Sequence, residues 1–167
     1  MSAACMSAGR AAAAWRALGQ VEDPEIPALT LVDLGIVRFA REEADGVLRI
    51  GLSPTYTGCP ATEHIETLAE EALDRAQLRP FSITRVLSPA WSSDWISADG
   101  RRKLSEYGIV PPPAAALALQ RASHAPVVCP RCGSTHTECT SQFGSTPCKA
   151  LHRCRDCLEP FECFKCI

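Results

Sequence analysis

Two pairs of cysteines near the carboxyl end of the chain have the spacing of a metal site. Cys129 and Cys132 form one C-x2-C pair, Cys154 and Cys157 form a second, and 21 residues separate the pairs. Each tight turn presents two thiolates, and four thiolates suit the tetrahedral coordination of zinc. A module of this size cannot build an adequate core unaided, so metal binding would supply its folding free energy. We therefore predict a zinc ribbon whose pairs are joined by a β-hairpin.

The other cysteines of this segment leave its ligand set open. Eight of the ten cysteines lie in residues 129–167, and Cys163 and Cys166 make a third C-x2-C pair. A second metal or a transferable iron–sulfur cluster on some of these thiols is one interpretation, and ordinary free cysteines beside a zinc site are the other. Two matched pairs argue against a purely redox dithiol. No signal-peptide core is visible in Ser2–Gln20, which argues against disulfides and for a cytoplasmic protein.

A third candidate for chemistry is Cys59, in the segment Ser53–Pro60 between an expected strand and an expected helix. Pro60 fits the first turn of that helix, because its missing N–H group costs nothing there. Cys59 would then lie near the helix cap, where free amides and the helix dipole favour a thiolate. A small buried residue is the alternative. Asp23 and Glu25 could join Cys59 if their proline-flanked loop folds across the helix start; otherwise they form a helix-terminating acidic loop.

The elements that must position these residues follow from periodicity. The expected elements are a helix over Ala11–Gln20, strands over Leu34–Arg41 and Val47–Ser53, a helix over Ala61–Gln77, a strand over Phe81–Leu87 and a helix over Asp99–Glu106. This order predicts an α+β domain of α-β-β-α-β type, with the long helix crossing over between two parallel strands. We place this domain at residues 11–110, a Pro/Ala-rich linker at 111–126 and the ribbon at 127–167.

Composition and charge exclude several classes of protein. The 167 residues carry 17 basic and 19 acidic side chains, which argues against a protein that mainly coats nucleic acid. The longest apolar run, Ala114–Leu119, is far too short to cross a membrane. Trp91 and Trp95 lie four apart in a polar segment, where they either form a partner surface or cover the end of the sheet.

Several motifs resemble known families. The segments Asp23–Pro27, Asp33–Gly35 and Pro54–Pro60 resemble the SufT-like domain of iron–sulfur cluster assembly. The combination of this domain with the remaining motifs is similar to the D-protein family encoded with phenylacetyl-CoA epoxidase in bacterial phenylacetate-degradation operons. Those motifs are Trp91–Ile96, Gly108–Pro112, Ser141–Leu151, Glu159–Phe161 and Phe164–Cys166.

The resemblance implies an accessory role in phenylacetate catabolism rather than a catalytic one. Its partners would be the oxygenase and reductase subunits of a di-iron epoxidase, whose reductase carries flavin and an iron–sulfur cluster. Cys59 would be the reactive thiol supported by Asp23 and Glu25, and a transient iron–sulfur cluster would accompany the zinc. Cys148 and Cys166 would be further family cysteines and additional metal ligands, whereas Cys139 and Cys163 depart from the pattern.

Two function classes remain open. A maturation factor would load iron or iron–sulfur centres, whereas a scaffolding subunit would dock oxygenase components without chemistry of its own. A nucleic-acid-binding ribbon is a third class, but residues 129–167 hold only five basic against four acidic side chains. Whether the chain forms a homo-oligomer stays open.

Overall fold

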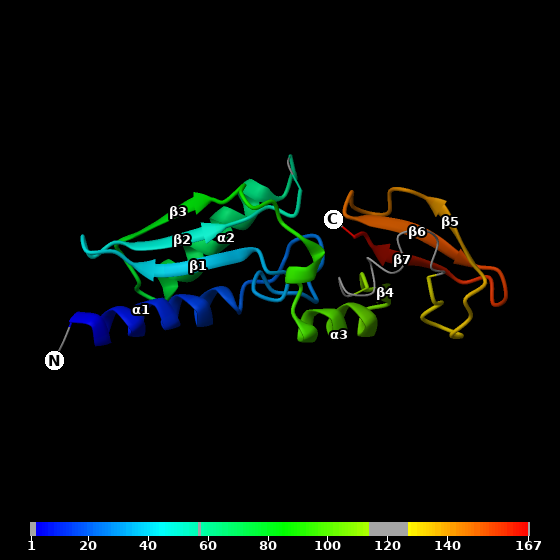
Figure 1. The fold of residues 1–167 in the computed structure, drawn as a ribbon, viewed down its shortest axis with the longest axis horizontal. Helices are drawn as coiled ribbons and strands as arrows, with labels where there is room; N and C mark the ends of the chain where they lie inside the picture. The colour runs from blue at the N-terminus through cyan, green and yellow to red at the C-terminus, as the bar shows by residue number, and fades with distance from the viewer. Residues whose placement is uncertain (1–2, 57, 114–126, 167) are drawn as a thin grey trace. The chain divides into compact units, whose positions relative to one another are not determined.

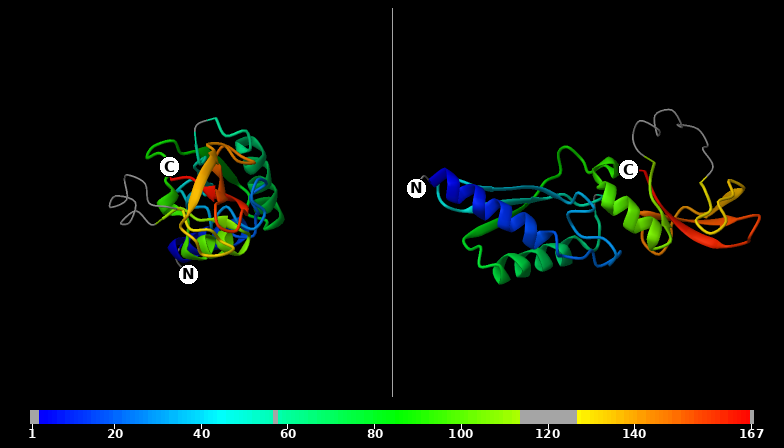
Figure 2. Two further views of the ribbon diagram at one scale, coloured as in Figure 1. Left: turned by 90° about the vertical axis from the view of Figure 1, so that its right-hand side faces the viewer. Right: turned by 90° about the horizontal axis from the view of Figure 1, so that it is seen from below.

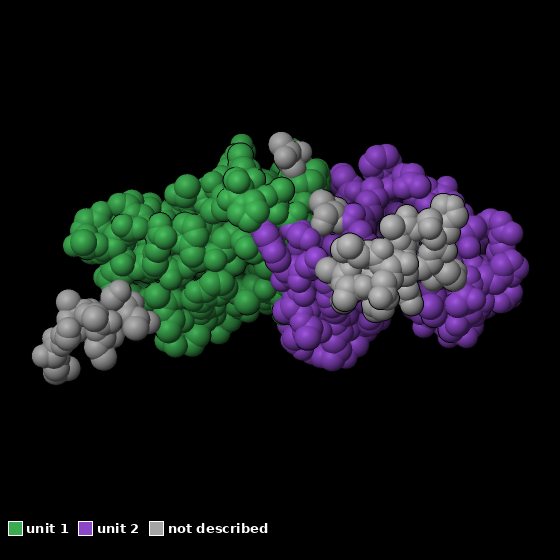
Figure 3. Space-filling view, in the orientation of Figure 1, with its two compact units in different colours: residues 1–91 green, residues 92–167 purple. Residues whose placement is uncertain are grey.

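The chain divides into two compact units. The computed structural model describes residues 3–56, 58–113 and 127–166. By their contacts these fall into unit 1, Met1–Trp91, and unit 2, Ser92–Ile167 (Figure 3). Most of the predicted linker lies outside the described residues. The predicted domain boundary near residue 110 therefore stays a prediction about which segments fold independently.

Unit 1 is a three-stranded sheet with two helices (Figure 1). Its elements are α1 (Ala3–Leu18), β1 (Val37–Glu42), β2 (Leu48–Leu52), α2 (Thr62–Arg75) and β3 (Phe81–Arg85). The strand order is β1-β2-β3, with β1 antiparallel and β3 parallel to β2. The predicted order of elements, and the crossover of the long helix between parallel strands, are both confirmed.

The core of unit 1 follows the predicted periodicity. Leu48, Ile50 and Leu52 alternate along β2 and are buried, and α2 buries a stripe that includes Ile65 and Leu73. Helix α1 begins at Ala3 rather than at the predicted Ala11. Alanine is the strongest helix former, and no proline interrupts the segment that precedes Ala11. The helix therefore extends toward the amino terminus.

Strand β1 begins three residues later than predicted because a turn occupies the segment before it. The carboxylate of Asp33 accepts hydrogen bonds from the amide and the hydroxyl of Thr30, at 3.0 and 2.9 Å. The backbone carbonyl of Leu34 accepts a 2.9 Å hydrogen bond from the indole of Trp91, which is buried. Trp91 is therefore buried against the turn before β1, whereas the predicted role of the Trp91 and Trp95 pair stays a prediction.

Unit 2 is a four-stranded sheet preceded by short helices (Figure 2). Its elements are η1 (Ser93–Trp95), α3 (Ala98–Glu106), β4 (Ile109–Val110), β5 (Thr137–Ser141), β6 (Lys149–Cys154) and β7 (Pro160–Phe164). The strand order is β4-β7-β6-β5. The predicted hairpin is confirmed as the antiparallel pair β5 and β6, whereas β4 pairs with β7 in parallel.

No helix in the described parts of the chain has the length and apolar character of a membrane span.

Candidate metal centre and thiol site

The four predicted zinc ligands converge at one end of the ribbon. Cys129 and Cys132 lie in the turn before β5, Cys154 ends β6, and Cys157 lies in the turn between β6 and β7. Their four sulfur atoms lie within 4.8 Å of one another. Cys129 and Cys154 are buried against Phe161, so the cluster is continuous with the small core of unit 2.

The sulfur geometry fits tetrahedral zinc. The Sγ atoms of Cys129 and Cys157 lie 3.7 Å apart, and those of Cys132 and Cys154 lie 3.6 Å apart. Zn–S bonds of about 2.3 Å at tetrahedral angles place neighbouring sulfurs about 3.8 Å apart, whereas a disulfide bond is only about 2.05 Å long. The four thiols therefore have the spacing of a metal cage and not that of two disulfides.

The electrostatics of the cage also favour a cation. The backbone amide of Cys157 hydrogen-bonds the sulfur of Cys154 and lowers the pKa of that thiol to about 6. At Cys132 the amide of Ser134 acts to lower the pKa, but hydrogen bonds with the other sulfurs raise it to about 12. Four thiolates at this spacing repel one another, so a divalent cation is what allows all four to be deprotonated.

The two cysteine turns have matching backbones. Gly133 follows the first C-x2-C pair with φ +73°, and its amide donates to the carbonyl of Cys129 at 3.0 Å. Leu158 follows the second pair with φ +63° and exposes its side chain. Glycine adopts this left-handed conformation without strain, whereas leucine does not.

The remaining cysteines of unit 2 lie outside the cage. Cys148 is buried with its sulfur 3.0 Å from the hydroxyl of Thr146, and Cys166 is exposed. Burial, and then the neighbouring thiols Cys166 and Cys139, raise the pKa of Cys163 to about 11. Among the described residues, the cage is the one group of three or more whose ligand atoms converge. Metal binding by Cys148 and Cys166 stays a prediction.

Cys59 lies just before helix α2. It is half-buried, and it precedes the N-cap residue Ala61 by two positions. Its carbonyl accepts hydrogen bonds from the amide and the hydroxyl of Thr62, at 3.2 and 2.8 Å. The turn therefore holds the backbone of Cys59 at the amino end of α2, although Pro60 precedes the helix instead of opening it.

Asp23 shapes its own loop. It is buried, and its Oδ1 accepts hydrogen bonds from the amides of Glu25 and Ile26, at 3.0 and 2.8 Å. Such a turn fixes the path of the chain after α1. Glu25 contributes its backbone amide to this turn, and its residue is half-buried. A role for either carboxylate beside Cys59 stays a prediction.

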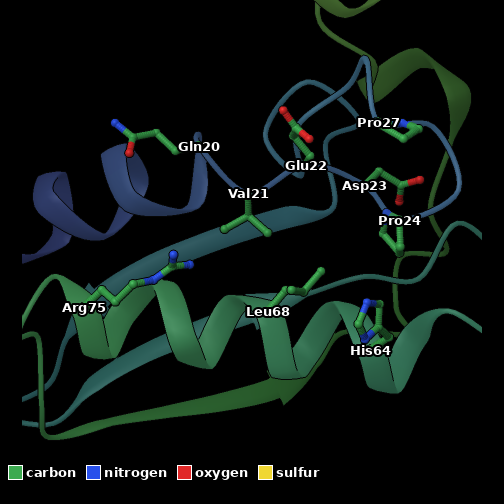
Figure 4. Close-up of a pocket in the computed structure, with 9 residues that line it drawn as sticks. All are labelled: Gln20, Val21, Glu22, Asp23, Pro24, Pro27, His64, Leu68 and Arg75. Carbon is green, nitrogen blue, oxygen red and sulfur yellow. The ribbon is translucent and has the colours of Figure 1, made fainter.

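A pocket of about 320 Å³ lies between this loop and α2 (Figure 4). Three of its lining residues lie on one face of α2: His64, Leu68 and Arg75. The other six follow α1: Gln20, Val21, Glu22, Asp23, Pro24 and Pro27. Neither Cys59 nor Glu25, both among the described residues, lines this pocket. Asp23 alone of the predicted thiol-site residues does.

Sequence reasoning missed this pocket, although a signal for half of it was present. His64, Leu68 and Arg75 have separations of four and seven residues, which place them on one face of a helix. They flank the buried stripe of α2, and from the sequence Leu68 indicates only core packing while His64 and Arg75 indicate only exposure to solvent. The loop that closes the pocket is irregular, so periodicity could not bring it to α2.

Comparisons with known proteins cover both units. A family described as iron-sulfur cluster assembly protein matches residues 11–80, and a family described as PaaD zinc beta ribbon domain matches residues 114–165. A crystal structure of a domain of unknown function, DUF59, from Bacillus anthracis shares the fold, with a TM-score of 0.56 and 22% identity. It covers 60% of this chain and 96% of that one.

Relatives with functional names also match the chain. The chain is 33% identical to the Fe-S protein maturation auxiliary factor YitW of Bacillus subtilis (strain 168), over 48% of this chain and 79% of the relative. It is 48% identical to an Escherichia coli (strain K12) protein named as a subunit of 1,2-phenylacetyl-CoA epoxidase, over 92% of this chain and 91% of the relative. The chain therefore belongs to the PaaD family of phenylacetyl-CoA epoxidase subunits.

Proposed function

We propose that this protein is an accessory maturation factor, which delivers iron–sulfur clusters or iron to the subunits of a phenylacetyl-CoA epoxidase. The observation that carries the proposal is the half-buried thiol of Cys59 at the amino end of α2. That thiol lies within the segment that matches the iron-sulfur cluster assembly family. The thiolate is the form of cysteine that binds iron.

In this function the cluster is cargo, and its transfer is a ligand exchange. An acceptor cysteine gives up its proton and binds iron as the bond between iron and Cys59 breaks. Cys59 takes up one proton, so charge balances and the oxidation state of iron does not change. A [2Fe–2S] cluster has four cysteine ligands in most proteins. One Cys59 is therefore insufficient, and the other ligands come from a second copy of the chain or from small thiols.

The ribbon has a structural role in this proposal. The four sulfurs of its cage would hold one zinc ion, which supplies the folding free energy that the small core of unit 2 lacks. A cage with all four positions filled by thiolates leaves no open coordination site for catalysis. Zinc would thus organise the ribbon, and Cys59 would handle the cargo.

The test is cluster assembly and transfer in anaerobic conditions. Wild-type protein, Cys59→Ser and the exposed-thiol control Cys139→Ser are reconstituted with iron and sulfide, then mixed with the apo form of the epoxidase reductase subunit. We expect visible absorption and transfer with the wild type and the control, and neither with Cys59→Ser. Equal cluster transfer by Cys59→Ser and the wild type would contradict the proposed role of Cys59 as the cluster carrier.

A second candidate function is that of a scaffolding subunit. The similarity to the Escherichia coli relative, which is named as an epoxidase subunit, favours it. It predicts a stable complex with oxygenase or reductase subunits that survives Cys59→Ser. Size-exclusion chromatography with light scattering of the mixed subunits distinguishes the two. A maturation factor gives a transient complex, and a scaffold gives one of fixed stoichiometry.

A further inference from the structure

The pocket between α2 and the loop after α1 combines an apolar centre with a charged end. Figure 4 shows Val21 and Leu68 facing each other across it, with Pro24 above His64 at one end and Arg75 at the other. Val21 is buried and Leu68 is half-buried. Between these two side chains the pocket is suited to an apolar group.

Arg75, at the charged end of the pocket, has no carboxylate partner among the described residues. The Nε atom of Arg75 donates to the backbone carbonyl of Glu71 at 3.2 Å, and no carboxylate of the described residues forms an ion pair with its guanidinium. Two arginines close to it in the chain differ, since Arg79 pairs with Asp74 and Arg85 with Glu66. Figure 4 shows the guanidinium of Arg75 directed toward Val21, along the pocket. A ligand carboxylate would therefore find an available partner there.

The size and place of the pocket indicate a polypeptide as its occupant. A volume of about 320 Å³ is at the lower end for small-molecule sites, and it accommodates one or two side chains of the kind that anchor protein interfaces. The other end of the pocket, His64, lies five residues after Cys59, in the first turn of the same helix. A segment seated in the pocket would hold its own protein beside the amino end of α2.

We propose that this pocket is the docking site for the acceptor protein of the Cys59 thiol, a proposal that rests on the function proposed above. The acceptor inserts an apolar side chain between Val21 and Leu68 and places a neighbouring carboxylate on Arg75. Electrostatic complementarity at one end then sets the direction of the bound segment. Docking and transfer use different residues of unit 1, so they can be separated by substitution.

The experiment measures binding of the apo reductase subunit to four variants by biolayer interferometry. Leu68→Glu places a carboxylate in the apolar centre, and Thr67→Glu makes the same change at the neighbouring exposed position. Arg75→Glu reverses the charged end, and Arg79→Glu makes the same reversal outside the pocket. We expect the two pocket variants to weaken binding by about tenfold or more and both controls to stay within about twofold of the wild type.

Two further readouts separate this proposal from the proposed function. Each pocket variant should still assemble the cluster, because Cys59 is intact, whereas Cys59→Ser should bind the acceptor normally but transfer nothing. Unchanged binding by both pocket variants, or no binding by the wild type, overturns the docking proposal. So does dimerisation of this chain that Leu68→Glu abolishes, because the pocket would then hold a second copy. Pocket-dependent binding without transfer would instead overturn the maturation role and leave the docking site standing.

Discussion

The sulfur atoms of Cys132 and Cys154 lie 3.6 Å apart although 21 residues separate them in the chain. This distance is close to the edge of a ZnS₄ tetrahedron, about 3.8 Å for Zn–S bonds of about 2.3 Å. The hairpin of β5 and β6 brings the two turns together, and the amides of each turn hydrogen-bond its own sulfurs. The fold of the protein therefore brings the sulfurs to the spacing that a bound zinc ion would require.

The first prediction concerns zinc and the stability of unit 2. Purified protein should contain one zinc ion per chain, and Cys154→Ser should lose it together with the ordered ribbon, because thiolate-bound zinc contributes about 10–16 kcal/mol in comparable modules. Cys139→Ser should retain the metal, since Cys139 lies outside the cage and is exposed. Elemental analysis and amide hydrogen exchange of residues 127–166 measure both effects. Zinc retained by Cys154→Ser would show that the cage is wrongly assigned.

The second prediction concerns a buried ion pair across β6 and β7. The Nζ atom of Lys149 lies 2.8 Å from Oε2 of Glu162, and their side chains are 5% and 23% exposed. Glu162→Gln leaves the buried ammonium without a carboxylate, which should cost about 3–5 kcal/mol in the free energy of unfolding. The exposed pair of Arg155 and Glu138 provides the control, because Glu138→Gln should cost about 1 kcal/mol or less. Urea unfolding with zinc present gives both values.

The ion pair of Lys149 and Glu162 also determines how the free energy of unfolding should depend on pH. Burial acts to raise the pKa of Glu162, but hydrogen bonds from Lys149 and from the amide of Ser145 outweigh it, and the pKa is lowered. A lowered pKa in the folded state adds stability above the ordinary value of 4.5 and loses it as the pH falls through the lower value. The difference in unfolding free energy between wild type and Glu162→Gln should therefore shrink below about pH 4.5. A difference that grows on acidification would contradict this.

How much of this structure the sequence predicts depends on how local each signal is. The spacing of Cys129, Cys132, Cys154 and Cys157 predicts a hairpin and a four-sulfur cage because short turns place their own ligands. Periodicity predicts α2 and β2 for the same reason. The pairing of β4 with β7 joins segments far apart in the chain, and no periodic pattern in the sequence predicts it. The pocket beside Asp23 needs an irregular loop to fold onto α2, so it too was beyond prediction.

The third prediction concerns Arg10, whose role the sequence did not indicate. From helix α1 its guanidinium donates to the carbonyls of Gly46, Leu78 and Pro80, at 2.9, 2.8 and 3.1 Å, and it pairs with Glu42. It thus ties α1 to the β1–β2 turn and to the segment before β3. Hydrogen bonds from a charged donor are worth about 1.5–3 kcal/mol each and are not additive.

Arg10→Ala should therefore destabilise unit 1 by about 2–3 kcal/mol. Arg16→Ala, an exposed arginine of the same helix, should change stability by about 0.5 kcal/mol or less. Urea unfolding monitored by far-ultraviolet circular dichroism compares the two variants. Equal effects would mean that the loss of a positive charge, and not the three carbonyl contacts, determines the result.

The fourth prediction uses the matched turns of the zinc cage. Gly133 and Leu158 each follow a C-x2-C pair with positive φ, but only the glycine is free of strain there. Leu158→Gly should stabilise the ribbon by about 1 kcal/mol, and Gly133→Ala should destabilise it by a similar amount. Because the side chain of Leu158 is exposed, its removal loses little buried apolar area.

The control Leu158→Ala separates the relief of backbone strain from the loss of the side chain. Alanine removes most of the side chain but keeps the strained backbone, so this variant should not be more stable than the wild type. Competition with a chelator measures zinc retention for all three variants, and greater retention by Leu158→Ala than by Leu158→Gly would show that the leucine conformation is not what limits the ribbon.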